Sequence, residues 1–290
     1  MRRRFISPLW FFFVGVLALA PGICAEPRVQ HPILPPQDHG RRPYPFLLSV
    51  PRDYARAPAT GWPLLVFLHG AGHSGENLWT LVTLGPPRLI EQGPDLSPAD
   101  RLAAEKLTTA FVVVSPQCPS GERWDNDRLS ATLDFVFAKT KVDASRVYLT
   151  GASMGGFGTW AFATQHPDRI AAIVPVCGGG VPRDVTHATG ERLRDLLELG
   201  VWAFHNDKDP TVNVSESRAM LDAFKSIHAR DVQLTIYPSN RHDAWTLTYR
   251  NLEVYDWLLR HQSSARNTNG ANAESTGGAD SKSRAERPRP

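Results

Sequence analysis

A serine flanked by glycines is the first feature of the chain that could do chemistry. Residues 151–155 read GASMG and fit the pattern G-x-S-x-G around Ser153, after an apolar run at 146–150 and before a helix-like run at 159–166. Between a strand and a helix this spacing forces a sharp turn, which presents the serine hydroxyl over a helix N-terminus. A structural glycine turn would also fit the five residues, but the strand-turn-helix context favours a nucleophile.

A serine hydroxyl needs a base to activate it, and the base needs an acid to orient it. His242 follows the last strand-like run of the chain, at 232–238. Asp207 and Asp209 follow the preceding strand-like run, at 201–205, and compete for the role of the acid. Because parallel strands end at one edge of a sheet, the loops that follow them are expected to meet there.

Strand-like and helix-like segments alternate through the middle of the chain. Short apolar runs predict strands at 44–50, 63–69, 110–115, 146–150, 170–176, 201–205 and 232–238. Apolar side chains recur at helical spacing over 129–140 and 215–227. The alternation predicts one α/β domain: a doubly wound, mostly parallel sheet with helices on both faces, without an internal repeat or a second domain.

Several motifs, in order along the chain, give the sequence a family resemblance. VFLHGAGHSG, VYLTGASMGGFGTWAFATQHPDRIAAIVPVCGGG, VWAFHNDKDPTVNVSESRAM and YPSNRHDAWTLTY resemble motifs of the bacterial carboxylesterase and phospholipase-type α/β-hydrolases. This group lies near the polyhydroxybutyrate depolymerases, the feruloyl-esterase-like enzymes and the prolyl-oligopeptidase-like esterases. The resemblance covers roughly residues 44–260 and implies the α/β-hydrolase fold and a serine esterase.

The resemblance also implies roles for single residues. Ser153 matches the family nucleophile and His242 the general base. The family's acid loop reads H-G-x-x-D-P-x-V-P, and residues 205–213 read HNDKDPTVN, which places Asp209 at the acid position and makes Asp207 a loop residue.

Two backbone amides match the family's oxyanion hole, the donors that hold the negative charge of the reacting carbonyl. One belongs to Ala71, which follows His-Gly in the HGAG motif, and the other to Met154. His69, at the start of that motif, is expected to brace the loop rather than act as a base.

Three positions depart from the family pattern. Asn206 replaces a glycine, Asn213 a proline, and Arg241 the small residue that usually precedes the histidine. Asparagine tolerates left-handed backbone better than most residues, so Asn206 can still make the turn. A cation at Arg241 would disfavour the charged imidazole unless its guanidinium points to solvent.

Candidate pocket residues follow strands at the same edge of the sheet. Gln117, Trp124 and Trp245 are the predicted lining, although Trp245 fits a core position equally well. The segment 74–107, rich in proline and glycine, is expected to form loops that set substrate specificity.

Composition excludes several classes of protein. The net charge is +3 and no basic stripe is present, which argues against a nucleic-acid partner. No C-x-x-C pair exists, so no metal site is expected, and the motifs imply no cofactor. Cys118 and Cys177 follow strands about three positions apart in the usual order, roughly 14 Å, which argues against a disulfide.

The two ends of the chain differ in composition from its middle. Residues 1–25, three arginines before a short apolar run and small residues, predict a cleavable export signal, with an uncleaved anchor as the alternative. A proline-rich lead-in is expected over 26–42, the catalytic domain over 43–261, and a disordered tail over 262–290.

These observations predict an exported serine carboxylic-ester hydrolase, periplasmic or extracellular, that acts on a small-molecule or polymer-linked ester. Beyond the export signal no membrane contact is expected, and the sequence assigns no oligomeric state. Two alternatives stay open: a serine peptidase of the prolyl-oligopeptidase-like type, and a non-catalytic binding protein on a hydrolase scaffold.

Overall fold

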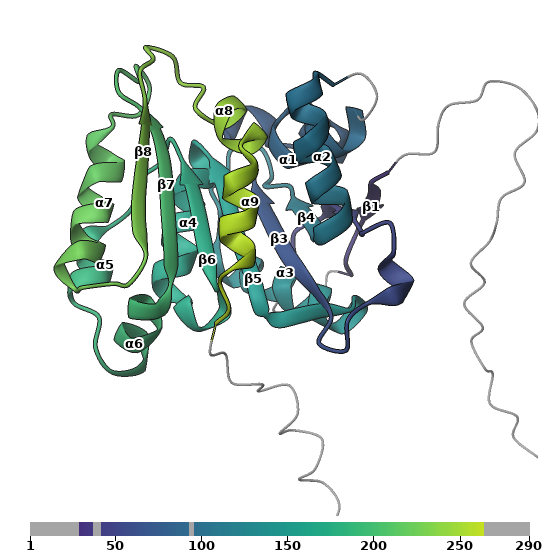
Figure 1. The fold of residues 1–290 in the computed structure, drawn as a ribbon, viewed down its shortest axis with the longest axis horizontal. Coiled ribbons are helices and arrows are strands. Elements are labelled where there is room, and N and C mark those ends of the chain that lie inside the picture. Colours follow the sequence, from purple (N-terminus) through teal and green to yellow (C-terminus); the bar gives the residue numbers. More distant parts are fainter. Residues whose placement is uncertain (1–28, 37–41, 93–95, 264–290) are drawn as a thin grey trace, which may run out of the picture.

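The computed structural model describes residues 29–36, 42–92 and 96–263 (Figure 1). The predicted export signal and nearly all of the predicted tail therefore lie outside the described residues. Gln262 and Ser263, the first two residues of that tail, are described, and both hydrogen-bond to Ser145.

The described residues form one eight-stranded sheet with the order β1-β2-β4-β3-β5-β6-β7-β8. The pairs from β4 to β8 are parallel, whereas β1 and β2 run antiparallel at one edge. The strands are β1 (His31–Ile33), β2 (Phe46–Ser49), β3 (Trp62–Leu68), β4 (Val112–Pro116), β5 (Val142–Ala152), β6 (Ala172–Val176), β7 (Gly200–Asn206) and β8 (Val232–Tyr237).

Helices cover both faces of the sheet, as the alternation of segments predicts (Figure 1). The α-helices are α1 (Gly85–Gln92), α2 (Pro98–Ala110), α3 (Asn126–Lys139), α4 (Met154–Gln165), α5 (Pro182–Thr186), α6 (Gly190–Glu198), α7 (Ser215–Ser226), α8 (Trp245–Arg250) and α9 (Leu252–Leu259). Short 3₁₀ helices are η1 (Tyr54–Arg56), η2 (Ala71–His73), η3 (Leu78–Thr83) and η5 (Pro167–Arg169). The predicted architecture, a doubly wound and mostly parallel α/β sheet with helices on both faces, is confirmed.

The central strand β3 separates two apolar cores. Leu64, Val66 and Leu68 pack with α3 to α7, while Leu65 and Phe67 pack with α1, α2, α8 and α9. Successive strand residues point to opposite faces, so a strand covered on both faces reads as a continuous apolar run.

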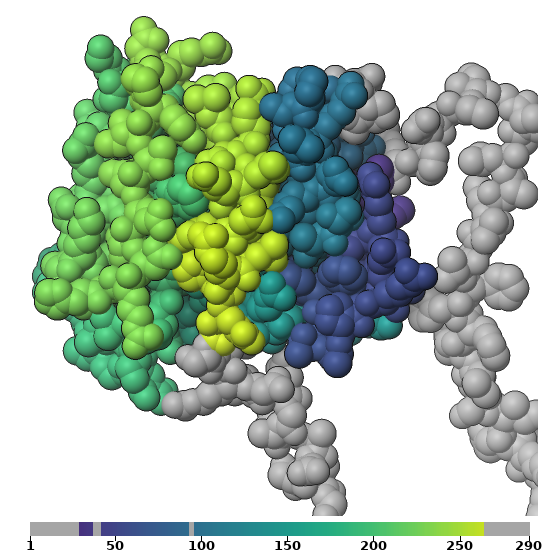
Figure 2. Space-filling view, in the orientation of Figure 1, coloured from purple at the N-terminus to yellow at the C-terminus, as the bar shows by residue number. Residues whose placement is uncertain are grey.

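The C-terminal helices α8 and α9 pack against α1 and α2 in the core that contains Leu65 and Phe67. Figure 2 shows the yellow C-terminal residues side by side with the blue residues of α1 and α2. Arg250 of α8 reaches Asp100 of α2 at 3.1 Å, and Lys106 of α2 reaches Asp256 of α9 at 2.5 Å.

The segment 74–107, expected to be loops, is instead largely helical. It contains η3, α1 and most of α2. Three of the prolines in this segment stand in the first turns of the two helices: α1 begins Gly85-Pro86-Pro87, and Pro98 follows the Ser97 cap. Proline is tolerated there because the first amides of a helix have no partner within it.

The predicted lead-in contributes a strand. β1 is extended, as a proline-rich segment favours, but it pairs with β2 and so belongs to the sheet. Gln30, just before β1, is buried and donates from Nε2 to the carbonyl oxygen of Pro87 at 2.9 Å.

Candidate active site

Ser153 occupies a sharp turn between β5 and α4. Its backbone has φ 55° and ψ −116°, one of three non-glycine residues with positive φ in the described part of the chain. Such conformations are costly for residues with a side chain and cluster at functional sites. The Ser153 amide donates to the carbonyl oxygen of Val176 at 2.9 Å, which ties the turn to the end of β6.

The glycines around Ser153 are required by close backbone contacts. A Cβ on Gly155 would collide with the carbonyl oxygen of Leu68 at the end of β3. A Cβ on Gly151 would collide with the carbonyl oxygen of Gly155 and lie 2.8 Å from that of Leu68. The G-x-S-x-G spacing therefore allows the start of α4 to press against β3.

The structure brings Ser153, His242 and Asp209 together. Nε2 of His242 lies 2.9 Å from Oγ of Ser153, and Nδ1 of the same ring lies 2.7 Å from Oδ2 of Asp209. The Asp209 side chain is fully buried and the His242 side chain is 19% exposed, so the imidazole stands between solvent and the carboxylate. The three residues come from the ends of β5, β7 and β8, at the edge where the sequence places them.

Asp209 is held as a carboxylate. Its burial alone would raise the pKa, but the amides of Val212 and Thr211 and the ring of His242 outweigh burial and lower the pKa of Asp209 below its usual value. Both amides donate to Oδ1, at 3.0 and 2.8 Å, which leaves Oδ2 for the imidazole. Asp207, the competing aspartate, instead accepts the amide of Ser239 at 2.8 Å and holds the loop.

The two predicted oxyanion donors belong to the first residues of two helices. Met154 is the first residue of α4 and Ala71 the first of η2, positions whose amides have no partner within the helix. A Cβ on Gly70, next to Ala71, would lie 3.5 Å from Cβ of Ser153, so the HGAG loop packs directly against the turn. Both predicted oxyanion donors therefore lie on segments that border Ser153.

His69 braces this loop from inside. Its Nδ1–H donates to the carbonyl oxygen of Gly70 at 2.7 Å, and its Nε2 accepts the amide of Cys118 at 3.0 Å. Burial lowers the pKa of His69 to about 4, although its hydrogen bond to the carbonyl oxygen of Gly70 acts in the opposite direction.

The buried neutral His69 makes stability depend on pH. A free histidine titrates near 6.5 and the folded one near 4, so the unfolded chain binds more protons between these values and stability falls as the pH falls through this window. Lowering the pH from 7 to 4 should remove up to about 3 kcal/mol from the free energy of unfolding through this residue. The free energies of unfolding from urea denaturation at pH 7 and pH 4 measure the loss.

The matched variant for this prediction is His69→Asn. It should be less stable than the wild type at pH 7, and its free energy of unfolding should change less between the two pH values. Equal pH dependence of the variant and the wild type would contradict the assignment.

The three candidate pocket residues lie in different places. Gln117 is fully buried, and its Nε2 donates to His73, Asn77 and Thr80 of the segment after the HGAG motif. Trp124 is 9% exposed and donates from Nε1 to the carbonyl oxygen of His69 at 3.2 Å. Gln117 and Trp124 therefore stabilise the HGAG motif and the segment after it through buried hydrogen bonds.

Trp245 lies beside the imidazole. Its ring meets that of His242 edge to face, with centroids 5.3 Å apart and planes at 90°. Trp245 also borders a small depression of about 60 Å³. The other lining residues are Thr83, Leu84, Gly85, Arg88, Leu89, Thr246 and Tyr249.

His205 is a further buried histidine near the site, and its sequence context does not predict the contacts of its ring. His205 contacts both the acid loop and α7: its Nε2–H donates to the carbonyl oxygen of Val212 at 3.0 Å, and its Nδ1 lies 2.7 Å from Oγ of Ser217. Burial lowers the pKa of His205. A histidine that opens the HNDKDPTVN loop was visible in the sequence, but its buried partners were not.

Cys177, His205 and Asp209 form the one described group with the spacing of a metal site. Burial raises the pKa of the Cys177 thiol to about 12, whereas a metal ligand must be a thiolate. Both nitrogens of His205 and both oxygens of Asp209 already have hydrogen-bond partners. The chemistry of these three side chains therefore does not fit a metal-binding site. Cys177 and Cys118 are free and buried, in line with the separation expected of their strands.

Comparison with known proteins places the chain in a family. Residues 105–260, more than half of the chain, match the family described as the alpha/beta hydrolase fold. The chain is an α/β hydrolase. The predicted resemblance is thereby confirmed at the level of the family.

This α/β hydrolase has relatives with named activities. It is 35% identical over 89 residues to poly(3-hydroxyalkanoate) depolymerase C of Paucimonas lemoignei, covering 25% of this chain and 22% of the relative. It is 27% identical over 158 residues to a bifunctional acetylxylan esterase/xylanase of Neocallimastix patriciarum, covering 51% and 21%. The α/β hydrolase thus spans about a fifth of the length of these two relatives.

A solved structure is similar over most of the domain. The crystal structure of a thermostable esterase matches 81% of this α/β hydrolase and 63% of its own chain, at 27% sequence identity and a TM-score of 0.63.

Proposed function

We propose that this α/β hydrolase is a serine carboxylic-ester hydrolase that works through an acyl-enzyme. Ser153 is the nucleophile, His242 the general base and Asp209 the acid that orients the imidazole. The observation that carries the proposal is the chain of contacts from Asp209 Oδ2 to His242 Nδ1 at 2.7 Å and from His242 Nε2 to Ser153 Oγ at 2.9 Å. The distances are those of a proton transfer from the hydroxyl to the imidazole.

The reaction follows from these contacts. His242 accepts the Ser153 proton as Oγ attacks the ester carbonyl, and the amides of Ala71 and Met154 hold the oxygen that becomes negative. Asp209 stabilises the imidazolium and keeps its Nε2 aimed at the reacting oxygen. The imidazolium then protonates the leaving alcohol, and a water activated by the same His242 releases the acid and restores Ser153.

We propose an ester rather than a peptide as the substrate for two reasons: the named activities of the relatives, and the single domain that the described residues form. The named relatives and the solved structure include a depolymerase of a polyester, an acetylxylan esterase and a thermostable esterase, which supports hydrolase activity of the esterase type. The described residues make one domain, without the large gating domain that usually accompanies peptidases with this type of turn. A non-catalytic scaffold would have no need of a strained serine in contact with an oriented histidine.

We propose that the enzyme is exported. We propose that its substrate is an ester, either a small molecule or a group linked to a polymer. The proposal rests on the export-signal pattern of residues 1–25 and on the polymer-linked esters in the names of the two relatives. Among the described residues, no helix has the length and apolar character to cross a bilayer.

A substrate panel tests the proposed reaction. Purified protein is assayed on acetyl, feruloyl, hydroxyalkanoate and longer-chain acyl esters, each beside the matching amide. We expect turnover of at least one ester class and no faster turnover of its amide. Faster cleavage of amides or peptides would favour the peptidase, and turnover of neither class would favour the binding protein.

A further inference from the structure

The side chain of Asn206 links the two loops that carry the acid and the base. Asn206 is the last residue of β7 and is fully buried. Its Nδ2–H donates to the main-chain carbonyl oxygen of Arg241 at 2.7 Å. Arg241 directly precedes His242, so this bond acts on the backbone that carries the imidazole.

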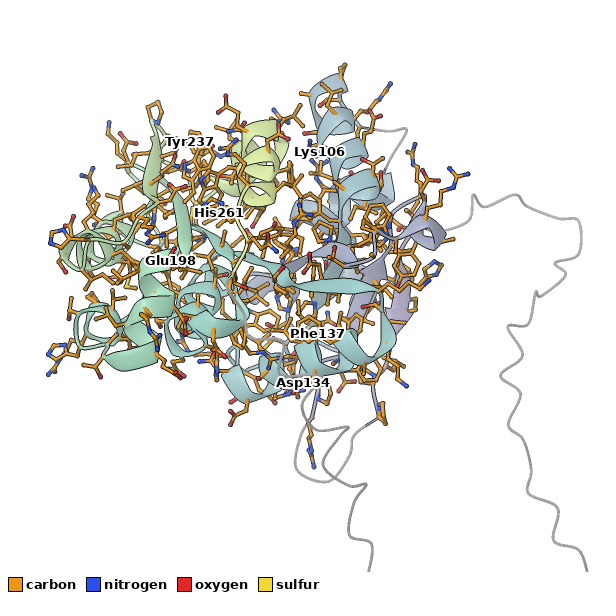
Figure 3. All side chains as sticks on the ribbon, turned by 60° about the horizontal axis from the view of Figure 1, so that its bottom comes forward. Lys106, Asp134, Phe137, Glu198, Tyr237 and His261 are labelled. Atoms are coloured by element: carbon orange, nitrogen blue, oxygen red, sulfur yellow. The ribbon has the colours of Figure 1, made fainter. Side chains whose placement is uncertain are left out.

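The first part of the histidine loop is held by other bonds. The amide of Asp207 donates at 3.0 Å to the carbonyl oxygen of Tyr237, the last residue of β8, which is labelled in Figure 3. The amide of Lys208 donates to the carbonyl oxygen of Ser239 at 3.1 Å, and the amide of Ser239 donates to Oδ1 of Asp207 at 2.8 Å. These bonds extend the β7–β8 pairing and end at Ser239.

Beyond Ser239 the support changes. Residues 240–242 have left the sheet, and the amide of Arg241 bonds only within its own loop, to Oγ of Ser239 at 3.2 Å. Within residues 42–92 and 96–263, the bond from Asn206 is the one we find that ties the backbone of 240–242 to another element. This donor therefore links the backbone next to His242 to the end of β7.

Neither the backbone conformation of Asn206 nor its side-chain oxygen explains why an asparagine occupies this position. Its backbone is not in the left-handed region, so the expected left-handed turn is not its role. Its Oδ1 is buried without a hydrogen-bond partner, and an unpaired buried oxygen disfavours folding. The Nδ2–H donor is thus the part of the side chain with a partner.

We propose that Asn206 is a positioning residue that holds the main chain of Arg241, so that the imidazole of His242 stays in line between Asp209 and Ser153. The inference rests on the proposed function, because it assigns Asn206 an effect through His242. The exposed side chain of Arg241 takes no part in the bond, which uses its carbonyl oxygen.

The test removes the donor and follows kcat and KM on the best ester of the panel. Asn206→Ala deletes the amide, and Asn206→Leu keeps nearly the same shape without a donor. Both should lower kcat by about 10- to 100-fold, because a misplaced base slows proton transfer, and should leave KM within about threefold. Asn213→Ala is the matched control: Asn213 lies in the same loop, and its side chain bonds locally to the amide of Ser215.

A double-mutant cycle separates positioning from a general structural effect. In a His242→Ala background, Asn206→Ala should cause no further loss of the residual activity, because a residue that acts through the imidazole has nothing left to position. An equal further loss in that background, or full activity of both Asn206 variants, would overturn the inference.

Comparing Ser153→Ala with the Asn206 variants shows whether the positioning role or the proposed function is wrong. If Ser153→Ala is inactive while the Asn206 variants are fully active, the positioning role alone is wrong. If Ser153→Ala keeps full activity, the proposed function is wrong whatever the Asn206 variants do.

Discussion

Replacing Ser153 with alanine is expected to lower kcat for ester hydrolysis by about 10⁴- to 10⁶-fold. The reason is the loss of the one oxygen that lies 2.9 Å from Nε2 of His242, since no acyl-enzyme can form without it. KM should change little, because the rest of the binding surface is intact. Steady-state kinetics on a p-nitrophenyl ester measures the effect.

Ser226→Ala serves as the matched control for this variant. Ser226 is an exposed residue of α7 whose hydroxyl donates to the carbonyl oxygen of Ala223 at 2.7 Å, away from the site. Its kcat should equal that of the wild type. A Ser153→Ala protein as active as the Ser226→Ala protein would contradict the assignment.

Replacing Gly155 with alanine is expected to lower the free energy of unfolding by about 3 kcal/mol or more and to remove activity. The added methyl group would collide with the carbonyl group of Leu68 and lie 2.9 Å from the carbonyl oxygen of His69. Backbone atoms cannot rotate away as a side chain can, so α4 must move off β3 and displace Ser153. Urea denaturation and ester hydrolysis measure the two effects.

Gly72→Ala is the control for the stability measurement. A Cβ at Gly72 has no neighbour within 4 Å, and its φ lies outside the left-handed region. Its urea midpoint should match that of the wild type within about 0.5 kcal/mol. Equal midpoints for the Gly155→Ala and Gly72→Ala proteins would show that the close contact is not rigid.

The sequence predicts the parts of this molecule that depend on local pattern. The runs at 63–69 and 201–205 become β3 and β7 within two residues, because continuous apolar character is typical of strands covered on both faces. Ser153 stands out for a similar reason, since the glycines that its turn requires are its near neighbours in the chain.

Other features depend on contacts between distant segments and leave no local signal. The helices within 74–107 were missed because prolines in a first helical turn look like loop residues until the helix is seen. The burial of Gln117 and Trp124 depends on the HGAG loop that they support. The bond between Asn206 and Arg241 joins residues 35 positions apart, so the asparagine reads in the sequence only as a departure from a glycine.

The central claim is that Ser153 is the activated nucleophile. The most direct test is to treat the protein with a fluorophosphonate and map the adduct by peptide mass spectrometry, beside the Ser153→Ala and His242→Ala variants. We predict one phosphonyl group, on Ser153, that appears as activity is lost, with labelling slowed in His242→Ala and absent in Ser153→Ala. An unlabelled wild-type protein that hydrolyses esters, or an adduct on another residue that tracks the loss of activity, would contradict the claim.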